Sequence, residues 1–96
     1  MAVAFTSAST TADVAVSSSQ GVRLLGWSIR ESATTAAVAT VILRNGDADS
    51  DQIVAQVELA GDTAETVSLM PQGVYCNQGI FVERAAGTTT VVVYTE

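Results

Sequence analysis

The sequence predicts an all-β protein, namely a small antiparallel β-sandwich or jelly-roll-like barrel of about seven or eight strands. Short apolar or alternating runs recur about every ten residues, and turn signals such as Asn45-Gly46 and Gly61-Asp62 separate them. β-branched residues are enriched in these runs. No segment has the apolar spacing of an amphipathic helix, so a doubly wound α/β fold is excluded.

Residues 1–20 are predicted to be an extended N-terminal arm or an edge strand, and residues 21–96 form the predicted sandwich domain. Asp13 is the only charged side chain in the arm, which is otherwise mostly Ala, Ser, Thr and Val. Within the arm, residues 12–18 place valines at alternate positions, which suits the edge of a sheet. A frayed terminus fits the same composition.

The run GVRLLGWSIRES, residues 21–32, is the first strong strand signal, and it is apolar on both faces. Strict alternation places one apolar set on the predicted core face: Leu25, Trp27 and Ile29. Val22 and Leu24 then lie on the opposite face, where we expect a partner or the N-terminal arm to cover them. Arg30 and Glu31 are expected at the rim of this contact. Phe5, from the arm, completes the predicted partner-contact residues.

The later strands follow from alternation and from their turns. Residues 35–44 favour a strand because β-branched side chains gather near their end. Residues 53–61 alternate most regularly, with one face predicted to be buried: Ile53, Ala55, Val57 and Leu59. Pro71, which cannot donate to a strand ladder, ends a shorter strand over residues 64–70. Three further short runs complete the predicted sheets: 74–76, 79–85 and 88–95.

The apolar content is high for so small a chain, which favours contacts with other chains. Folding 96 residues hides only about 60% of the surface of the unfolded chain. Yet 48% of the residues are hydrophobic and 15% are charged. Few Lys or Pro residues are present to protect the edge strands. We therefore predict a homo-oligomer, a trimer included, or docking on a larger scaffold. The alternative is that alanine, a weak hydrophobe, inflates the apolar count.

The charge pattern excludes nucleic acid as a direct ligand. The chain carries ten acidic and four basic residues, and its arginines are well separated: Arg23, Arg30, Arg44 and Arg84. Phosphate binding needs clustered positive charge. We expect no membrane contact, because no apolar run approaches the length of a membrane span. The single Cys76 cannot form an intrachain disulfide, and no signal peptide is evident, which predicts synthesis in a reducing compartment.

The residues predict neither an enzyme nor a cofactor site. The chain has no His, which removes the usual general base and the commonest metal ligand. Cys76 alone cannot build a zinc site and is expected to be a small core residue. Residues 47–51 place aspartates at alternate positions, as at the start of an EF-hand loop. Gln52 stands where that loop needs Gly, and Glu58 falls in a predicted strand, so a solvated acidic turn is the preferred interpretation.

A sugar-binding groove would need exposed aromatic side chains, and the chain has five aromatic residues: Phe5, Trp27, Tyr75, Phe81 and Tyr94. Three of them lie in strong strand patterns and are more simply core or interface residues: Trp27, Phe81 and Tyr94. A carbohydrate-binding or adhesin domain is therefore an alternative of another class. In that alternative Trp27 or Tyr75 would stand exposed and stack on a sugar.

The spacing Arg-Leu-x-Gly-Trp-Ser-x-Arg-Glu within residues 21–32 resembles small structural proteins of tailed bacteriophages, particularly those that infect actinobacteria. The similarity continues through residues 43–46, 53–59 and 79–84 and leaves the arm unmatched. The resemblance implies a β-sandwich virion protein without catalytic residues, made in the host cytoplasm. It implies the major capsid protein or another virion protein as partner. Capsid decoration on the outside of the head is the main expectation, with a tail or head-tail component as the alternative.

Overall fold

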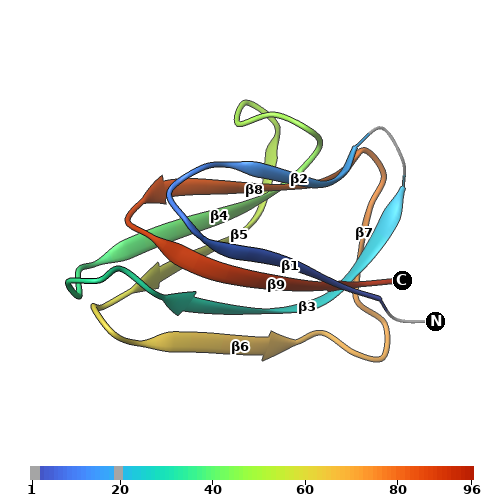
Figure 1. Ribbon diagram of the computed structural model, residues 1–96. Coiled ribbons are helices and arrows are strands. Elements are labelled where there is room, and N and C mark those ends of the chain that lie inside the picture. Colours follow the sequence, from blue (N-terminus) through green and yellow to red (C-terminus); the bar gives the residue numbers. More distant parts are fainter. Residues whose placement is uncertain (1–2, 19–20) are drawn as a thin grey trace.

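The protein is all-β in its computed structural model, which describes residues 3–18 and 21–96 (Figure 1). Residues 1–2 and 19–20 of the predicted arm lie outside the described residues. The described chain forms nine strands: β1 (Val3–Thr10), β2 (Val14–Ser18), β3 (Val22–Glu31), β4 (Ala39–Asn45), β5 (Gln52–Leu59), β6 (Ala64–Ser68), β7 (Val74–Cys76), β8 (Gly79–Ala86) and β9 (Thr89–Thr95). The predicted fold class is confirmed.

The strands form two antiparallel sheets with the order of a jelly roll. Sheet A runs β1-β9-β3-β6, and β7 pairs with the first residues of β3; sheet B runs β2-β8-β4-β5. Strands of the first half pair with strands of the second half in reverse order: β1 with β9, β2 with β8, β3 with β6 and β7, and β4 with β5. The chain is thus one long hairpin rolled into a two-layer sandwich.

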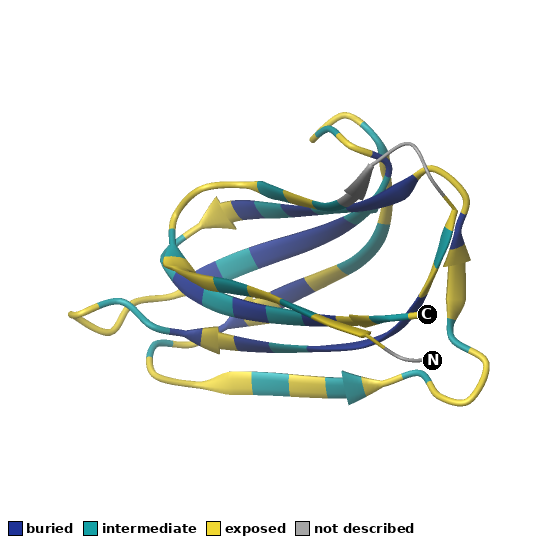
Figure 2. Ribbon diagram, turned by 45° about the vertical axis from the view of Figure 1, so that its right-hand side comes forward, coloured by how far each residue is buried: buried dark blue, intermediate teal, exposed yellow. Residues whose placement is uncertain are grey.

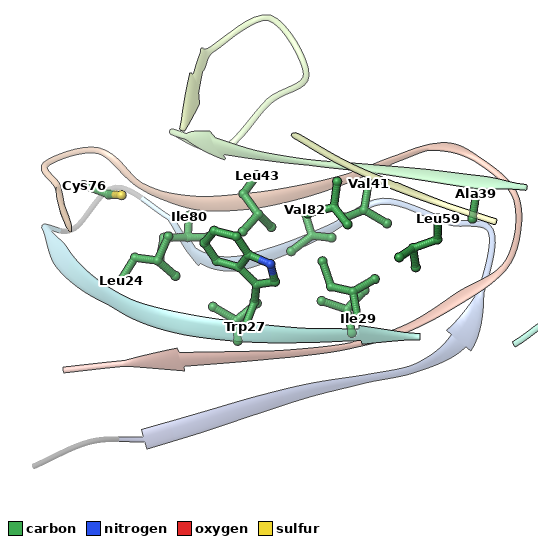
Figure 3. Packing of buried hydrophobic residues seen from close by; sticks show 13 residues of the cluster. Leu24, Trp27, Ile29, Ala39, Val41, Leu43, Leu59, Cys76, Ile80 and Val82 are labelled. Atoms are coloured by element: carbon green, nitrogen blue, oxygen red, sulfur yellow. The ribbon is translucent and has the colours of Figure 1, made fainter. Parts of the chain in front are cut away.

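The hydrophobic core fills the space between the two sheets (Figure 3). Trp27 is 7% exposed, and its indole extends from β3 towards sheet B beside Leu24 and Ile29. The burial pattern along the central strands alternates, as expected for a sandwich with one wet face per sheet (Figure 2). The buried cluster consists of Leu24, Trp27, Ile29, Ala39, Val41, Leu43, Val57, Leu59, Cys76, Ile80, Val82, Val91 and Val93.

The position of Leu24 corrects the prediction from strict alternation. Its side chain is fully buried in the core on the same side as Trp27, so it is unable to contact a partner. The reason is a register shift between Leu24 and Gly26 in the pairing with β9, which inserts an extra residue and offsets the alternation. Leu25, predicted for the core face, is buried outside the core cluster. The segment 69–73 covers it, with the Leu69 amide donating to the Leu25 carbonyl at 2.7 Å.

A second register shift corrects the predicted face of β5. Val57 and Leu59 are buried in the core as predicted, but Ile53 is 50% exposed. Leu43 pairs with Ala55 while the next residue of β4 pairs with Ile53, so one residue of β5 is unpaired between them. That extra residue turns Ile53 away from the core.

Residues 3–18 supply one edge strand to each sheet. β1 pairs with β9 at the edge of sheet A, and β2 pairs with β8 at the edge of sheet B. Residues 11–13 connect the two strands and carry the chain across the sandwich (Figure 1). The predicted edge strand at residues 12–18 therefore corresponds to β2, and the residues before it form a strand of their own.

Candidate interaction surface

The described residues show surfaces instead of a cavity. No pocket and no group of three or more His, Cys, Asp or Glu side chains able to hold a metal ion occurs within residues 3–18 and 21–96. No apolar helix of membrane-spanning length is found in that part of the chain. The candidate functional site is therefore sought among exposed faces and sheet edges.

The outer face of sheet A is rich in hydroxyl groups and carries few charges. Strand pairing aligns its side chains in rows across β1, β9, β3 and β6. The hydroxyls of Ser28 and Thr66, on neighbouring strands, are hydrogen-bonded at 3.1 Å. Arg30 is its only charged side chain, and it is exposed. The face consists of Ala4, Thr6, Ser28, Arg30, Ala64, Thr66, Ser68, Thr90, Val92 and Tyr94.

A group of exposed side chains lies next to this face, on the connection between β6 and β7 and on the paired residues of β3 and β7. We call it the end patch, and it consists of Arg23, Met70 and Tyr75. Met70 is 62% exposed and Tyr75 59%, whereas Val74, 41% exposed, pairs with Leu24 and lies on the other face of β7. The Arg23 guanidinium lies 5.9 Å from the centre of the Tyr75 ring, a cation–π distance. Figure 2 shows that β7 and the preceding connection are largely exposed.

The backbone around the end patch holds its side chains in place. Arg23 Nη1 donates to the Gln72 carbonyl at 3.0 Å, and the Gly73 amide donates to the Leu69 carbonyl at 2.8 Å. Gly73 has a φ of 68°, which favours glycine because a side chain is strained there. The Tyr75 ring occupies the space that a Cβ on Gly21 would need. Hydrogen bonds thus fix the backbone of the connection against β3 and position Tyr75 beside Arg23.

Acidic side chains gather on the opposite side of the molecule. Glu58 and Glu83 project from the outer face of sheet B, where Glu83 Oε1 accepts a hydrogen bond from Arg44 Nε at 2.7 Å. The connection between β4 and β5 carries Asp47, Asp49 and Asp51. The charges are thus unevenly distributed: the outer face of sheet A carries Arg30 alone, whereas the outer face of sheet B and the connection between β4 and β5 carry these five carboxylates and Arg44.

The acidic turn is held by its own backbone. Asp51 Oδ2 accepts hydrogen bonds from the amides of Asp47 and Ala48 at 2.8 and 3.0 Å. Arg44 Nη1 donates to the Asp51 carbonyl at 2.7 Å. These bonds engage the carboxylate that an EF-hand loop would direct towards the cation. The geometry fits a solvated turn whose own aspartate side chain accepts hydrogen bonds from its backbone amides.

The remaining predicted contact residues occupy different environments. Arg30 is exposed on the outer face of sheet A. Val22 is half-buried and packs against the core. Phe5 is half-buried on β1, opposite Val93, on the side of sheet A that faces the core. The structure therefore does not bring them together with Leu24 into a single contact face.

Glu31 is 3% exposed, which contradicts its predicted position at a rim. Its carboxylate accepts hydrogen bonds from the amide of Asp62 at 2.7 Å and from the amide of Ala33 at 2.9 Å. These backbone bonds, the one from Asp62 first, lower the pKa of Glu31 although desolvation acts against them. The side chain serves to tie together the connections that follow β3 and β5.

Sequence reasoning missed the role of Arg84, which is 6% exposed. Its guanidinium donates from Nε to Thr89 Oγ1 at 3.0 Å, from Nη1 to the Ala12 carbonyl at 2.7 Å and from Nη2 to Ser7 Oγ at 2.8 Å. Burial lowers the pKa of Arg84, while the charge of Asp13 acts in the opposite direction. Its position was visible in the sequence, because Arg84 alternates in phase with two apolar core residues of β8: Ile80 and Val82.

The aromatic residues separate into core and surface. Trp27 is enclosed in the core, which contradicts a sugar-stacking role for this side chain. Its Nε1 has no hydrogen-bond partner among the described residues. Tyr75 and Tyr94 are exposed on the side of sheet A.

Comparisons of the chain with protein-family models, with curated proteins and with solved structures found no match.

Proposed function

We propose that this protein is a non-enzymatic structural protein of a virion, bound as a decoration protein to the outer surface of a phage head. The resemblance of residues 21–32 is the basis for this class of protein, and it implies synthesis in the host cytoplasm. The jelly roll supports the proposal, since capsid proteins use this architecture, although lectins use it as well. A tail or head-tail position is the alternative within the virion.

The observation that carries the proposal is the composition of the side presented by sheet A. None of the ten side chains of its outer face is a carboxylate, on a chain with a net charge of −6; Glu96, which pairs with Arg23 through two backbone hydrogen bonds, is the acidic residue that adjoins this side. The adjacent end patch adds Tyr75, Met70 and Arg23, and Tyr, Met and Arg are enriched at the centres of protein interfaces. Sheet A would therefore face the shell, and the acidic surface would face the solvent.

Repetition on a shell makes weak individual contacts sufficient when copies are joined to one another, because each further contact is then intramolecular. A face without a pocket among the described residues suits this arrangement better than it suits binding of a small molecule, which requires a concave site. The partner would be the major capsid protein or another protein of the virion surface.

Co-sedimentation with empty heads assembled from a candidate major capsid protein tests the proposal. We expect the purified chain to sediment with the heads and the double variant Tyr75→Ser/Tyr94→Ser to stay in the supernatant. Gln56→Ser, on the outer face of sheet B, is the matched control and should bind as the native chain does. Binding to purified tails in place of heads would move the protein to the alternative position. A chain that binds neither particle would overturn the proposal.

The exposure of Tyr75 favours one function of another class, namely a carbohydrate-binding or adhesin domain. A ring that is 59% exposed offers a surface for stacking on a sugar. In a glycan array this function predicts retention on defined sugars and loss of that retention in Tyr75→Ser. Retention by the native chain without binding to virion particles would favour the carbohydrate-binding function.

A further inference from the structure

The edges of the described sandwich are protected to different degrees. β7, which pairs only with β3 and shares the edge of β6, has just three residues, and a strand this short is itself a protection. β5 carries Glu58 and follows the acidic turn, while β6 carries Glu65 and is followed by Pro71. β2 has five residues, a register shift within its pairing with β8, and Asp13 directly before it. Charges, prolines and irregular pairing all discourage the addition of a further strand. Three edges therefore carry a recognisable protection.

β1 carries none of these protections over most of its length. It is eight residues long and contains no charged residue and no proline. Its pairing with β9 is regular from Val3 to Ser7 and shifts only between Ser7 and Thr10. Val3 is 57% exposed and Phe5 is half-buried at this open side of the sandwich. The unpaired backbone groups of such an edge form a template for another strand.

We propose that two copies of this chain pair through their β1 strands, antiparallel and about a twofold axis, so that their A sheets form one continuous sheet. The net charge of −6 makes two copies repel each other, which favours contact through the one unprotected edge that is uncharged. Because β1 carries no charged side chain, pairing of two copies of β1 brings no like charges together. The added strand also covers apolar surface at Val3 and Phe5. This pairing does not depend on the proposed function.

The twofold axis fixes which side chains meet. It stands perpendicular to the sheet, so each side chain faces a side chain from the same face of the other copy. An axis centred anywhere from Phe5 to Ser7 places the two Thr6 side chains opposite or diagonal to each other. Thr6 is exposed on the outer face of sheet A and pairs with Val92 on β9. Both outer faces then point the same way and form one surface of double width.

Sedimentation equilibrium over a range of concentrations tests the pairing directly. We expect the native chain to approach twice its 9.9 kDa mass. Thr6→Lys and Thr6→Glu should each weaken the dimer by about tenfold or more, because like charges meet near the axis. The matched control is Thr66→Lys, on the same face but at the opposite edge of sheet A, and it should dimerise as the native chain does.

A mixture of Thr6→Lys and Thr6→Glu separates charge repulsion at the axis from misfolding of either variant. Opposite charges at the axis should restore the dimer in the mixture although each variant alone is monomeric. A Thr6→Cys variant should also form an intermolecular disulfide on oxidation, while Thr66→Cys should not. A native chain that stays monomeric at high concentration would overturn the pairing. A trimer, or a dimer equally affected by both lysine variants, would overturn it as well.

The native chain distinguishes this pairing from the proposed function, because Thr6 also belongs to the face proposed to contact the shell. Dimerisation is measured on the isolated chain, whereas shell binding requires particles. If the native chain sediments with heads but stays monomeric in isolation, the proposed function stands and the pairing fails. If the native chain dimerises but binds no particle, the pairing stands and the proposed function fails.

Discussion

The guanidinium of Arg84 donates a hydrogen bond of 2.7 Å to the backbone carbonyl of Ala12, a residue 72 positions earlier in the chain. This bond fastens the connection between β1 and β2 to β8. The neighbouring Asp13 carboxylate accepts a further bond from the Arg84 amide at 2.9 Å. The crossing from sheet A to sheet B is therefore held by one residue of the last hairpin.

Replacing Arg84 should destabilise the fold strongly. Arg84→Met removes every donor from a buried site and leaves the Ala12 carbonyl without its partner, so we expect a loss of about 3 kcal/mol of unfolding free energy. Arg84→Lys keeps the charge but loses the planar guanidinium group, so its free energy of unfolding should lie between those of the native chain and Arg84→Met. Urea denaturation measures the difference. Arg30→Met, at an exposed position, should change stability by less than about 0.5 kcal/mol.

Trp27→Ala should cost about 3 kcal/mol or more in unfolding free energy, because it removes the largest side chain of the core and leaves a cavity. Trp27→Phe should cost clearly less, since it fills part of that space and removes an Nε1 donor that has no partner among the described residues. Thermal unfolding followed by circular dichroism measures both. A melting temperature of Trp27→Ala close to that of the native chain would contradict the position of this side chain in the core.

Alternation and turn residues predicted the sandwich because each strand has one buried face and each turn needs particular residues. They did not predict the faces of Leu24 and Ile53, because the register shifts beside them depend on the neighbouring strands and not on local spacing. Gly26 was the available signal. A Cβ on it would overlap the backbone carbonyl of Val67, so only glycine permits this approach of β6 to β3.

The candidate interaction surface could be predicted from the sequence less well than the fold could. Glu31 and Arg84 look like surface residues by type, yet both are buried and hydrogen-bonded to backbone groups of distant segments. Conversely, the end patch arises because the chain between β6 and β7 folds back along β3, which brings Tyr75 beside Arg23. Only the pairing of strands distant in sequence produces such a surface.

Glu31 should make stability depend on pH in acid. Its pKa lies below the ordinary value of 4.5 in the folded protein because backbone amides bind the charged form. Its contribution is therefore complete above the unfolded pKa and is lost as the pH falls through the folded pKa. We expect Glu31→Gln to be less stable than the native chain at pH 7 and to approach it below about pH 4.

Urea denaturation of both proteins at several pH values measures this difference. Glu58→Gln, at an exposed position on β5, is the control and should parallel the native chain at every pH. A constant gap between Glu31→Gln and the native chain from pH 7 to about pH 3 would contradict the role of the Glu31 charge.

Cys76 should be protected from thiol reagents in the folded protein. Its side chain is 1% exposed in the core, and burial raises the pKa of its thiol, so little thiolate is present to react. A chromogenic disulfide at pH 8 should therefore react slowly with the native chain and quickly after addition of denaturant. In Thr66→Cys, the exposed second thiol should react at once while Cys76 stays slow. Rapid reaction of the native chain would mean that β7 separates from β3 far more readily than the packed core allows.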